Sequence, residues 1–205
     1  MFSPVKKKVF FENYIFNVWS EVYEPAEDSF LFAENLTVKE GENVLDMGTG
    51  CGILGIVAAN KASRVVAVDI NPYAVCCAKE NAKLNGVSDK MFFVQGNLFT
   101  PIRAEEKFDL ILFNAPYLPS EPFEGEIWIE KAWAGGVNGR AVVNRFLHDF
   151  SAYLKEGGRV LLVQSTLADL DKTLEILKTK GFKTRIVTER DLPFFETITL
   201  IEAKH

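Results

Sequence analysis

From residue 43 onward, short apolar runs alternate with longer amphipathic ones, and this alternation limits the fold more than any other feature of the sequence. A short apolar run followed by helical periodicity is typical of βαβ units, whose strands lie parallel in one sheet. The sequence therefore predicts a parallel sheet with helices between its strands. The expected strands are 44–47, 65–69, 92–95 and 110–113, and the expected helices begin near Ile53 and at Pro72, the second running to about Asn85.

The C-terminal part departs from this pattern. A strand at 158–164 and a helix at 167–179 are followed by two strands, 183–188 and 197–202, with too few residues between them for a crossover helix. These last strands must therefore pair antiparallel. An otherwise parallel seven-stranded sheet with a reversed C-terminal strand is the Rossmann-like α/β architecture of class I methyltransferases, whereas a nicotinamide dehydrogenase has six parallel strands.

The composition fits one domain. The chain has 205 residues, of which 48% are hydrophobic and 25% charged, and this is enough apolar material for a single core. We therefore expect one domain over residues 1–205, with residues 1–36 as a short N-terminal extension outside the main alternation. In it, apolar residues from Val9 to Val18 cluster around Glu12-Asn13, which indicates a hairpin, and Pro25 precedes a helical pattern over 26–36.

The charge and the cysteines exclude several classes of protein. A net charge of −5 and a pI near 5.2 disfavour a protein that binds nucleic-acid phosphates, and the basic run Lys6-Lys7-Lys8 fits a solvated end better than a phosphate contact. Cys51, Cys76 and Cys77 lack the spacing of a zinc site or a redox pair, so we expect three buried thiols and no metal. The odd cysteine count and the absence of a leader or a long apolar run indicate a cytoplasmic protein without a membrane segment.

The glycine-rich segment after the first strand of the sheet predicts a cofactor loop. Residues 50–55 match the dinucleotide pattern G-x-G-x-x-G, but the strand already ends at Met47, so the register is wrong for a pyrophosphate site. Counted from the strand, the motif is an acidic residue followed by alternate glycines, as in the loop that binds S-adenosylmethionine (AdoMet). Bare glycines let the backbone approach the cofactor, and a carboxylate suits its cationic sulfonium and amino group. The loop residues are Asp46, Gly48, Thr49, Gly50 and Gly52.

Residues outside this loop complete the expected cofactor site. Asp69 ends the next strand, where its carboxylate is placed to accept from the ribose hydroxyls. Asn97 follows the third strand of the sheet, where it either meets the adenine amino group or is an exposed turn residue. Pro25 and Glu27 precede or open the first helix, and we expect them to form a lid over the cofactor, although an acidic first turn also suits a helix dipole.

The strand at 110–113 runs into Asn114-Ala115-Pro116-Tyr117, which predicts methyl transfer to nitrogen. An amide or exocyclic amine nitrogen is a poor nucleophile because its lone pair is delocalised, so the site must hold it in line with the methyl group. The Asn114 side-chain oxygen and the Ala115 carbonyl can accept its two N–H hydrogens. Pro116 fixes the turn, and Tyr117 can pack on the flat face of the substrate group. No strong general base is required.

Four segments, 24–29, 46–52, 114–117 and 132–140, make the chain resemble the HemK-type protein glutamine methyltransferases, which methylate the glutamine of the Gly-Gly-Gln loop of peptide-chain release factors. The chain is most similar to the shorter archaeal and eukaryotic branch, which lacks the helical N-terminal domain of the bacterial enzymes. In this family the four residues that correspond to 114–117, the tetrad, are usually Asn-Pro-Pro-Tyr. Ala115 is therefore a departure, but one that keeps the backbone carbonyl.

The resemblance also implies partners. The protein substrate would be a release factor, alone or with its GTPase partner, and relatives work with a small zinc-binding activator subunit. We expect such a subunit at the apolar strand Met91-Phe92-Phe93-Val94, which lies at the sheet edge in this fold.

Other acceptors stay open. Asn-x-Pro-Tyr also occurs in RNA and DNA methyltransferases that act on adenine N6 or guanine N2. Glu121, Glu124, Glu126 and Glu130 follow the tetrad and fit a basic protein loop better than a nucleic acid, although they also suit a solvated loop. Methylation of lysine, or a binding role without catalysis, fits the motifs less well.

Overall fold

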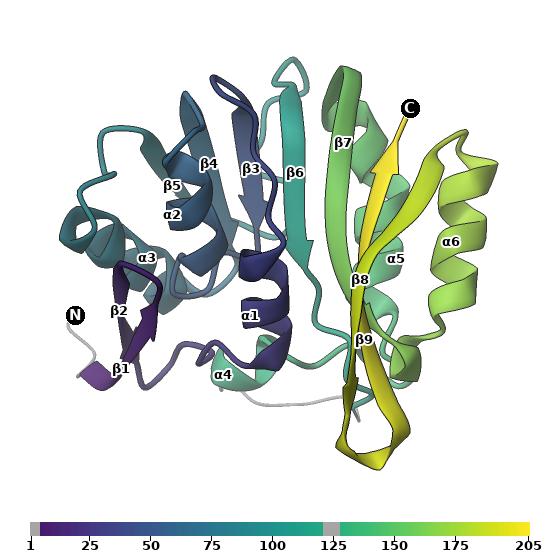
Figure 1. Cartoon of the computed structure of the whole chain (residues 1–205), viewed down its shortest axis with the longest axis horizontal. Helices are drawn as coiled ribbons and strands as arrows, with labels where there is room; N and C mark the ends of the chain where they lie inside the picture. The colour runs from purple at the N-terminus through teal and green to yellow at the C-terminus, as the bar shows by residue number, and fades with distance from the viewer. Residues whose placement is uncertain (1–4, 121–127) are drawn as a thin grey trace.

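The computed structural model describes residues 5–120 and 128–205, and they form a sheet with helices on both faces (Figure 1). The helices are α1 (Glu27–Glu34), α2 (Ile53–Ala59), α3 (Pro72–Leu84), α4 (Trp128–Lys131), α5 (Ala141–Asp149) and α6 (Leu170–Thr179). The strands are β1 (Val5–Phe11), β2 (Tyr14–Trp19), β3 (Asn43–Met47), β4 (Arg64–Asp69), β5 (Met91–Gln95), β6 (Phe108–Asn114), β7 (Leu154–Ser165), β8 (Lys183–Leu192) and β9 (Glu196–Lys204). Short 3-10 turns cover Phe150–Tyr153, Thr166–Ala168 and Pro193–Phe195.

The seven-stranded sheet confirms the predicted fold class. Its strand order is β5-β4-β3-β6-β7-β9-β8. The pairs among β3 to β7 are parallel, whereas β9 is antiparallel to both β7 and β8. The reversed strand is thus the last one, as expected, and it lies between β7 and β8 so that β8 forms the edge. The predicted edge position of β5 is also confirmed.

Alternation of apolar side chains along the central strands gives the sheet two buried faces. Val44 and Leu110 face the core that α1, α2 and α3 cover, together with the β1–β2 hairpin. Leu45 and Ile111 face the opposite core, which α5 and α6 cover. Both faces are filled, and this explains why these strands are almost continuously apolar in sequence.

Several element boundaries differ from the sequence expectation. Helix α6 begins at Leu170 because Asp169 caps it, its carboxylate accepting from the Lys172 amide at 3.1 Å, and residues 166–168 form a separate turn. Strand β7 begins at Leu154 because an irregular register near Leu110 accommodates extra residues before Arg159. Strands β8 and β9 are longer than expected because their charged ends continue to pair beyond the apolar runs.

One cysteine prediction was wrong. Cys51 and Cys77 are buried, but Cys76 is exposed. Adjacent residues of a helix point in directions about 100° apart, so the two neighbours on α3 cannot both face the core. No helix in the described ranges is long and apolar enough to span a membrane.

Candidate functional site

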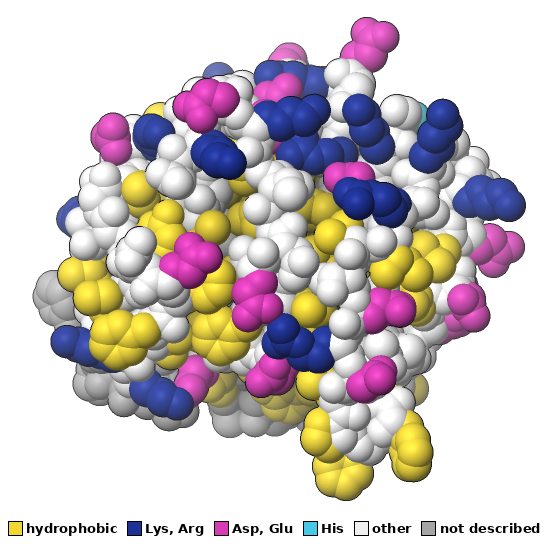
Figure 2. Space-filling view, viewed as in Figure 1, with side chains coloured by type: hydrophobic (Ala, Val, Ile, Leu, Met, Phe, Trp, Pro, Cys, Tyr) yellow, Lys and Arg dark blue, Asp and Glu magenta, His cyan; other side chains and the backbone are white. Residues whose placement is uncertain are grey.

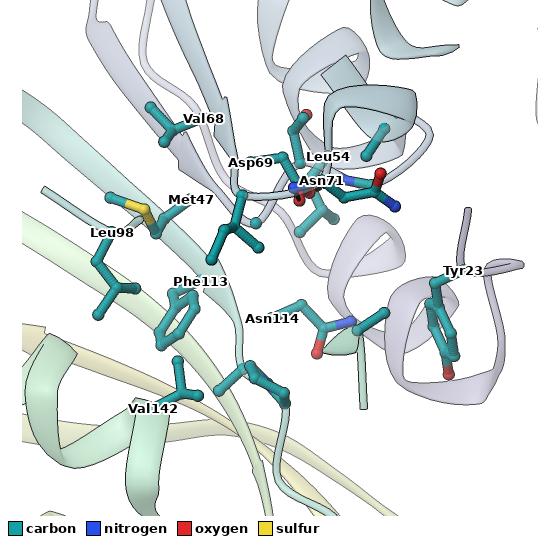
Figure 3. A pocket seen from close by; sticks show the side chains of 18 of the residues that line it. Tyr23, Met47, Leu54, Val68, Asp69, Asn71, Leu98, Phe113, Asn114 and Val142 are labelled. Carbon is teal, nitrogen blue, oxygen red and sulfur yellow. Dashed lines mark hydrogen bonds between the residues drawn. The ribbon is translucent and has the colours of Figure 1, made fainter. Parts of the chain in front are cut away.

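A cavity of about 290 Å³ lies at the carboxyl ends of β3, β4 and β6 (Figure 3). The strand order reverses between β3 and β6, and open α/β sheets bind ligands at such a switch point. The apolar wall of the cavity includes Met47, Val68, Leu98, Phe113 and Val142. The polar residues that line it are Asp69, Asn71, Asn97 and Asn114.

The glycines of the loop divide into two groups. Gly48 and Gly50 line the cavity with φ of 72° and 56°, which favours glycine, and a Cβ on Gly50 would meet nothing within 4 Å. Gly52 does not line the cavity, and its Cβ would lie 3.1 Å from Ala78 on α3. The first two glycines therefore leave room at the cavity surface, whereas Gly52 is required for packing.

Asp46 turns away from the cavity and holds the loop from behind. It is 1% exposed, and its carboxylate accepts from the Thr49 hydroxyl at 2.6 Å and from the Gly55 amide at 3.0 Å. Burial raises the pKa of Asp46 to about 6, although these two hydrogen bonds oppose the shift. Thr49 thus lines the cavity while its side chain is tied to Asp46.

Asp69 faces the cavity and is fixed by backbone amides. Its two carboxylate oxygens accept from Gly50 N and Asn71 N, each at 2.9 Å. Burial raises the pKa of Asp69, and the amide donors oppose this shift. The contact to Gly50 links the end of β4 to the loop that follows β3, so the two predicted cofactor elements form one surface.

Asn114 has a defined amide orientation. Its Nδ2 donates to Asp28 Oδ2 at 3.0 Å and to Ser29 Oγ at 3.4 Å. A carboxylate can only accept, so this contact fixes the NH2 group toward α1. Asn114 Oδ1 is buried and has no hydrogen-bond partner among the described residues. The asparagine therefore presents a free acceptor oxygen, which is the chemistry required to hold an N–H group.

Asp28 is a site residue that the sequence pattern did not single out. It is 6% exposed and lines the cavity, and besides Asn114 it contacts the Ser29 amide at 2.7 Å and the Tyr23 hydroxyl at 3.4 Å. The signal was present, because residues 24–29 form a recognisable motif, but the pattern did not show which of its acidic residues points inward.

The remaining tetrad residues lie where the turn leaves the sheet. Ala115 and Pro116 line the cavity, whereas Tyr117 is 9% exposed and lines a smaller adjoining hollow of about 30 Å³ with Leu118 and Trp133. Burial, followed by the charge of Asp28, raises the pKa of the Tyr117 phenol. The ring is therefore a neutral aromatic surface beside the tetrad.

The segment 132–140 packs directly on the tetrad. The Leu118 amide donates to Trp133 O at 3.1 Å, and the Gly135 amide donates to Leu118 O at 2.8 Å. A Cβ on Gly139 would collide with the Tyr117 carbonyl. The buried Arg140 donates to Thr173 Oγ1 at 3.0 Å and anchors the segment to α6. This segment, one of the four that carry the family resemblance, thus packs behind the tetrad.

The three other predicted cofactor residues have different positions. Pro25 and Asn97 line the cavity, and Asn97 Oδ1 accepts from Arg145 at 3.1 Å. Glu27 does not line it. Its carboxylate is exposed and pairs with Arg190 of β8 at 2.7 Å. The N-terminal extension thus contributes Tyr23, Pro25 and Asp28 to the cavity lining.

The fold and this site together define a class I methyltransferase. The family model for ribosomal protein L11 methyltransferase (PrmA) matches residues 28–115, less than half of the chain. A putative protein N5-glutamine methyltransferase of Methanocaldococcus jannaschii is 44% identical over 88% of this chain and 90% of its own length. Methyltransferase HEMK2 of Homo sapiens is 37% identical over 80% of this chain and 81% of its own.

Solved structures agree with these relatives. The Mtq2–Trm112 complex of E. cuniculi, described as responsible for methylation of the termination factor eRF1, matches with a TM-score of 0.65 and 25% identity, covering 90% of this chain and 98% of that one. A tRNA m1G37 methyltransferase of M. jannaschii has a TM-score of 0.69 at 22% identity, over 96% of this chain and 56% of its own, and shares the fold alone. The chain belongs to the HemK-type family of protein glutamine N5-methyltransferases, which use AdoMet.

Proposed function

We propose that this enzyme methylates the side-chain amide of the glutamine in the Gly-Gly-Gln loop of a translation release factor. The observation that carries the proposal is the orientation of Asn114, a residue of the cavity wall whose buried Oδ1 is unpaired among the described residues while Asp28 holds its Nδ2. The relatives are named as glutamine methyltransferases, and this arrangement is the one that an amide acceptor needs. Because release factors act in translation, we also propose a cytoplasmic location for this enzyme.

The cavity has the features that AdoMet requires. Gly48 and Gly50 leave space at the loop surface, Asp69 offers a fixed carboxylate for ribose hydroxyls, and the apolar wall with Leu98 suits a purine ring. Asn97 would hold the adenine amino group, and Pro25 would cover the cofactor. Asp46 and Gly52 would act indirectly, by holding the loop. Bound there, AdoMet supplies the electrophilic methyl group.

The tetrad would orient the acceptor amide. Asn114 Oδ1 and the Ala115 carbonyl would each accept one N–H hydrogen, so that the nitrogen lone pair points at the methyl group. As the nitrogen becomes cationic, both contacts strengthen, and they stabilise the transition state more than the bound substrate. The proton can then leave to solvent. Pro116 would keep the turn rigid, and Tyr117 would pack against the flat amide.

Asp28 is expected to position Asn114. Asp28→Asn keeps the size of the side chain but adds an NH2 group that competes for the same contact, so the Asn114 amide loses its single orientation. We expect kcat to fall by about ten-fold, with AdoMet affinity and the thermal unfolding midpoint unchanged. Steady-state kinetics measure kcat, and calorimetry measures AdoMet affinity and the thermal unfolding midpoint. The control is Asp89→Asn, a carboxyl that lies before β5 and does not line the cavity. Equal losses in both variants, or weaker AdoMet binding in Asp28→Asn, would contradict the positioning role.

A direct comparison of acceptors tests the proposal against the nucleic-acid alternative. Transfer of labelled methyl from AdoMet is expected to a Gly-Gly-Gln protein and not to RNA or DNA. Salt should weaken the reaction only modestly, because few exposed pairs are involved, whereas a nucleic acid would lose affinity steeply. Label on nucleic acid alone would overturn the proposal. The glutamates at 121, 124 and 126 lie outside the described residues, so their contribution stays a prediction.

We also propose an activator subunit at the β5 edge, with any zinc in that partner. Phe92 is 52% exposed, and the Arg64 guanidinium lies over its ring, 5.2 Å from the ring centroid. Phe93 instead packs partly into the core. Phe92→Lys is expected to weaken the complex by at least ten-fold, measured by co-purification and titration. Phe10→Lys on β1, where Phe10 is 65% exposed, is the control and should leave binding unchanged. A fully active monomer with a neutral Phe92→Lys change would refute this partner.

A further inference from the structure

Two aromatic side chains at the turn between β8 and β9 are not packed against any part of the described chain. Phe194 is 94% exposed and Phe195 is 103% exposed. Figure 1 shows the hairpin extending past the rest of the sheet, and Figure 2 shows apolar side chains gathered at its end. Scattered exposed hydrophobic residues are ordinary, but two adjacent aromatic rings on a projecting turn are not, and such groups are typical anchors of protein interfaces.

The backbone holds these rings outward at a cost. Phe194 and Phe195 have φ of 64° and 62°, in the left-handed region that is unfavourable for side chains of this size. Both side chains are almost fully exposed, so their packing on the described chain does not offset this backbone strain.

The part of the hairpin next to the tip is joined to the wall of the methyl-transfer site. Arg190 of β8 pairs with Glu27 at 2.7 Å and with Glu34 at 2.8 Å, both on α1, and α1 also carries Asp28, which holds Asn114. On the other strand, Ile198 pairs with Ser165 at the carboxyl end of β7, and Val163 of β7 pairs with Asn114. Strand β9, which begins at Glu196, therefore starts at the same end of the sheet as the tetrad.

The tip is consequently at the same end of the molecule as the tetrad (Figure 1). Phe195 directly precedes Glu196, and consecutive Cα atoms are about 3.8 Å apart. The cavity, the tetrad and the hairpin tip thus lie at one end of the molecule, so a folded protein whose loop enters the cavity would face the tip. The exposed carboxylates Glu189 and Asp191 flank it and favour a basic surface over a nucleic-acid backbone.

We propose that Phe194 and Phe195 form a docking site for the folded acceptor protein, packing against an apolar patch bordered by basic residues next to the loop that is methylated. The inference rests on the proposed function and extends it, because recognition would then require the folded protein as well as its loop. A short peptide with the same glutamine would reach the cavity without touching the tip.

The test compares two acceptors, a folded Gly-Gly-Gln release factor and a short peptide with the same loop sequence. The enzyme is used with its activator subunit if activity requires one. For Phe194→Ser/Phe195→Ser we expect KM for the folded protein to rise by at least ten-fold, with kcat and the kinetics of the peptide unchanged. The control is Ile186→Ser, which alters another exposed apolar residue of β8, 46% exposed and farther from the tip.

The outcomes separate this inference from the proposed function. Unchanged kinetics on both acceptors, or equal losses on both, would overturn the docking role while leaving the proposed function intact. Wild-type enzyme that methylates neither acceptor would overturn both. The double variant could instead lose a dimer or lose activator binding, with the kinetics on the folded protein restored at higher enzyme or activator concentration. That result would assign the tip to a second copy or to the activator and would refute the inference.

Discussion

Asn114→Ala is expected to lower kcat by about 100-fold or more while AdoMet affinity stays the same. The variant removes the buried Oδ1 that accepts from the substrate nitrogen, and losing one positioned polar contact of this kind costs on the order of 3 kcal/mol in the transition state. Turnover is measured at saturating acceptor, and cofactor affinity by calorimetry. The fold should persist, because the side chain forms its hydrogen bonds with Asp28 and Ser29 at the cavity wall and not within the core.

A matched variant separates this effect from general damage. Asn60→Ala changes an exposed asparagine at the end of α2, outside the cavity lining, and should leave turnover unchanged. Near-normal turnover of Asn114→Ala, or a loss of similar size in Asn60→Ala, would remove Asn114 from the proposed mechanism.

Gly50→Val is expected to weaken AdoMet binding by at least 100-fold, since the branched side chain would occupy the space that the loop leaves at the cavity. The loop cannot easily move to make room for AdoMet, because the Gly50 amide donates to the Asp69 carboxylate at 2.9 Å. Calorimetry or a thermal-shift titration with AdoMet measures the change.

The chain supplies a control for the backbone strain in that variant. Gly41 has φ of 79°, and a Cβ added to it would also meet nothing within 4 Å, but this glycine does not line the cavity. Gly41→Val should therefore lose a comparable amount of stability, about 1–2 kcal/mol from the left-handed backbone, and bind AdoMet normally. If both variants bound AdoMet equally, the loop assignment would be wrong.

The sequence was most informative where the polar site residues coincide with the ends of predicted strands. The strands β3, β4 and β6 end at Met47, Asp69 and Asn114, so the strand ends and the polar residues at or next to them could be predicted together. Parallel strands bring their carboxyl ends to one edge, and this was enough to place the glycine loop and the tetrad at one cavity.

Contacts between distant segments could not be predicted in the same way. The pattern gave no means to choose between Glu27 and Asp28, because both lie in the first turn of α1, and only packing shows that Asp28 reaches Asn114 while Glu27 pairs with Arg190. The inward turn of Asp46 and the packing role of Gly52 likewise depend on neighbours farther along the chain, Gly55 and Ala78. The projecting β8–β9 tip was missed because charged strand ends have no periodic apolar signal.

Methylation of a glutamine side chain by this enzyme can be observed by mass spectrometry of a Gly-Gly-Gln release factor incubated with enzyme and isotopically labelled AdoMet. We expect one labelled methyl group on the side-chain nitrogen of that glutamine, formed much more slowly by Asn114→Ala and absent when the glutamine is replaced by glutamate. A labelled methyl group on lysine, on another residue or only on added RNA or DNA, with the Gly-Gly-Gln loop unmodified, would contradict the assignment of glutamine as the acceptor.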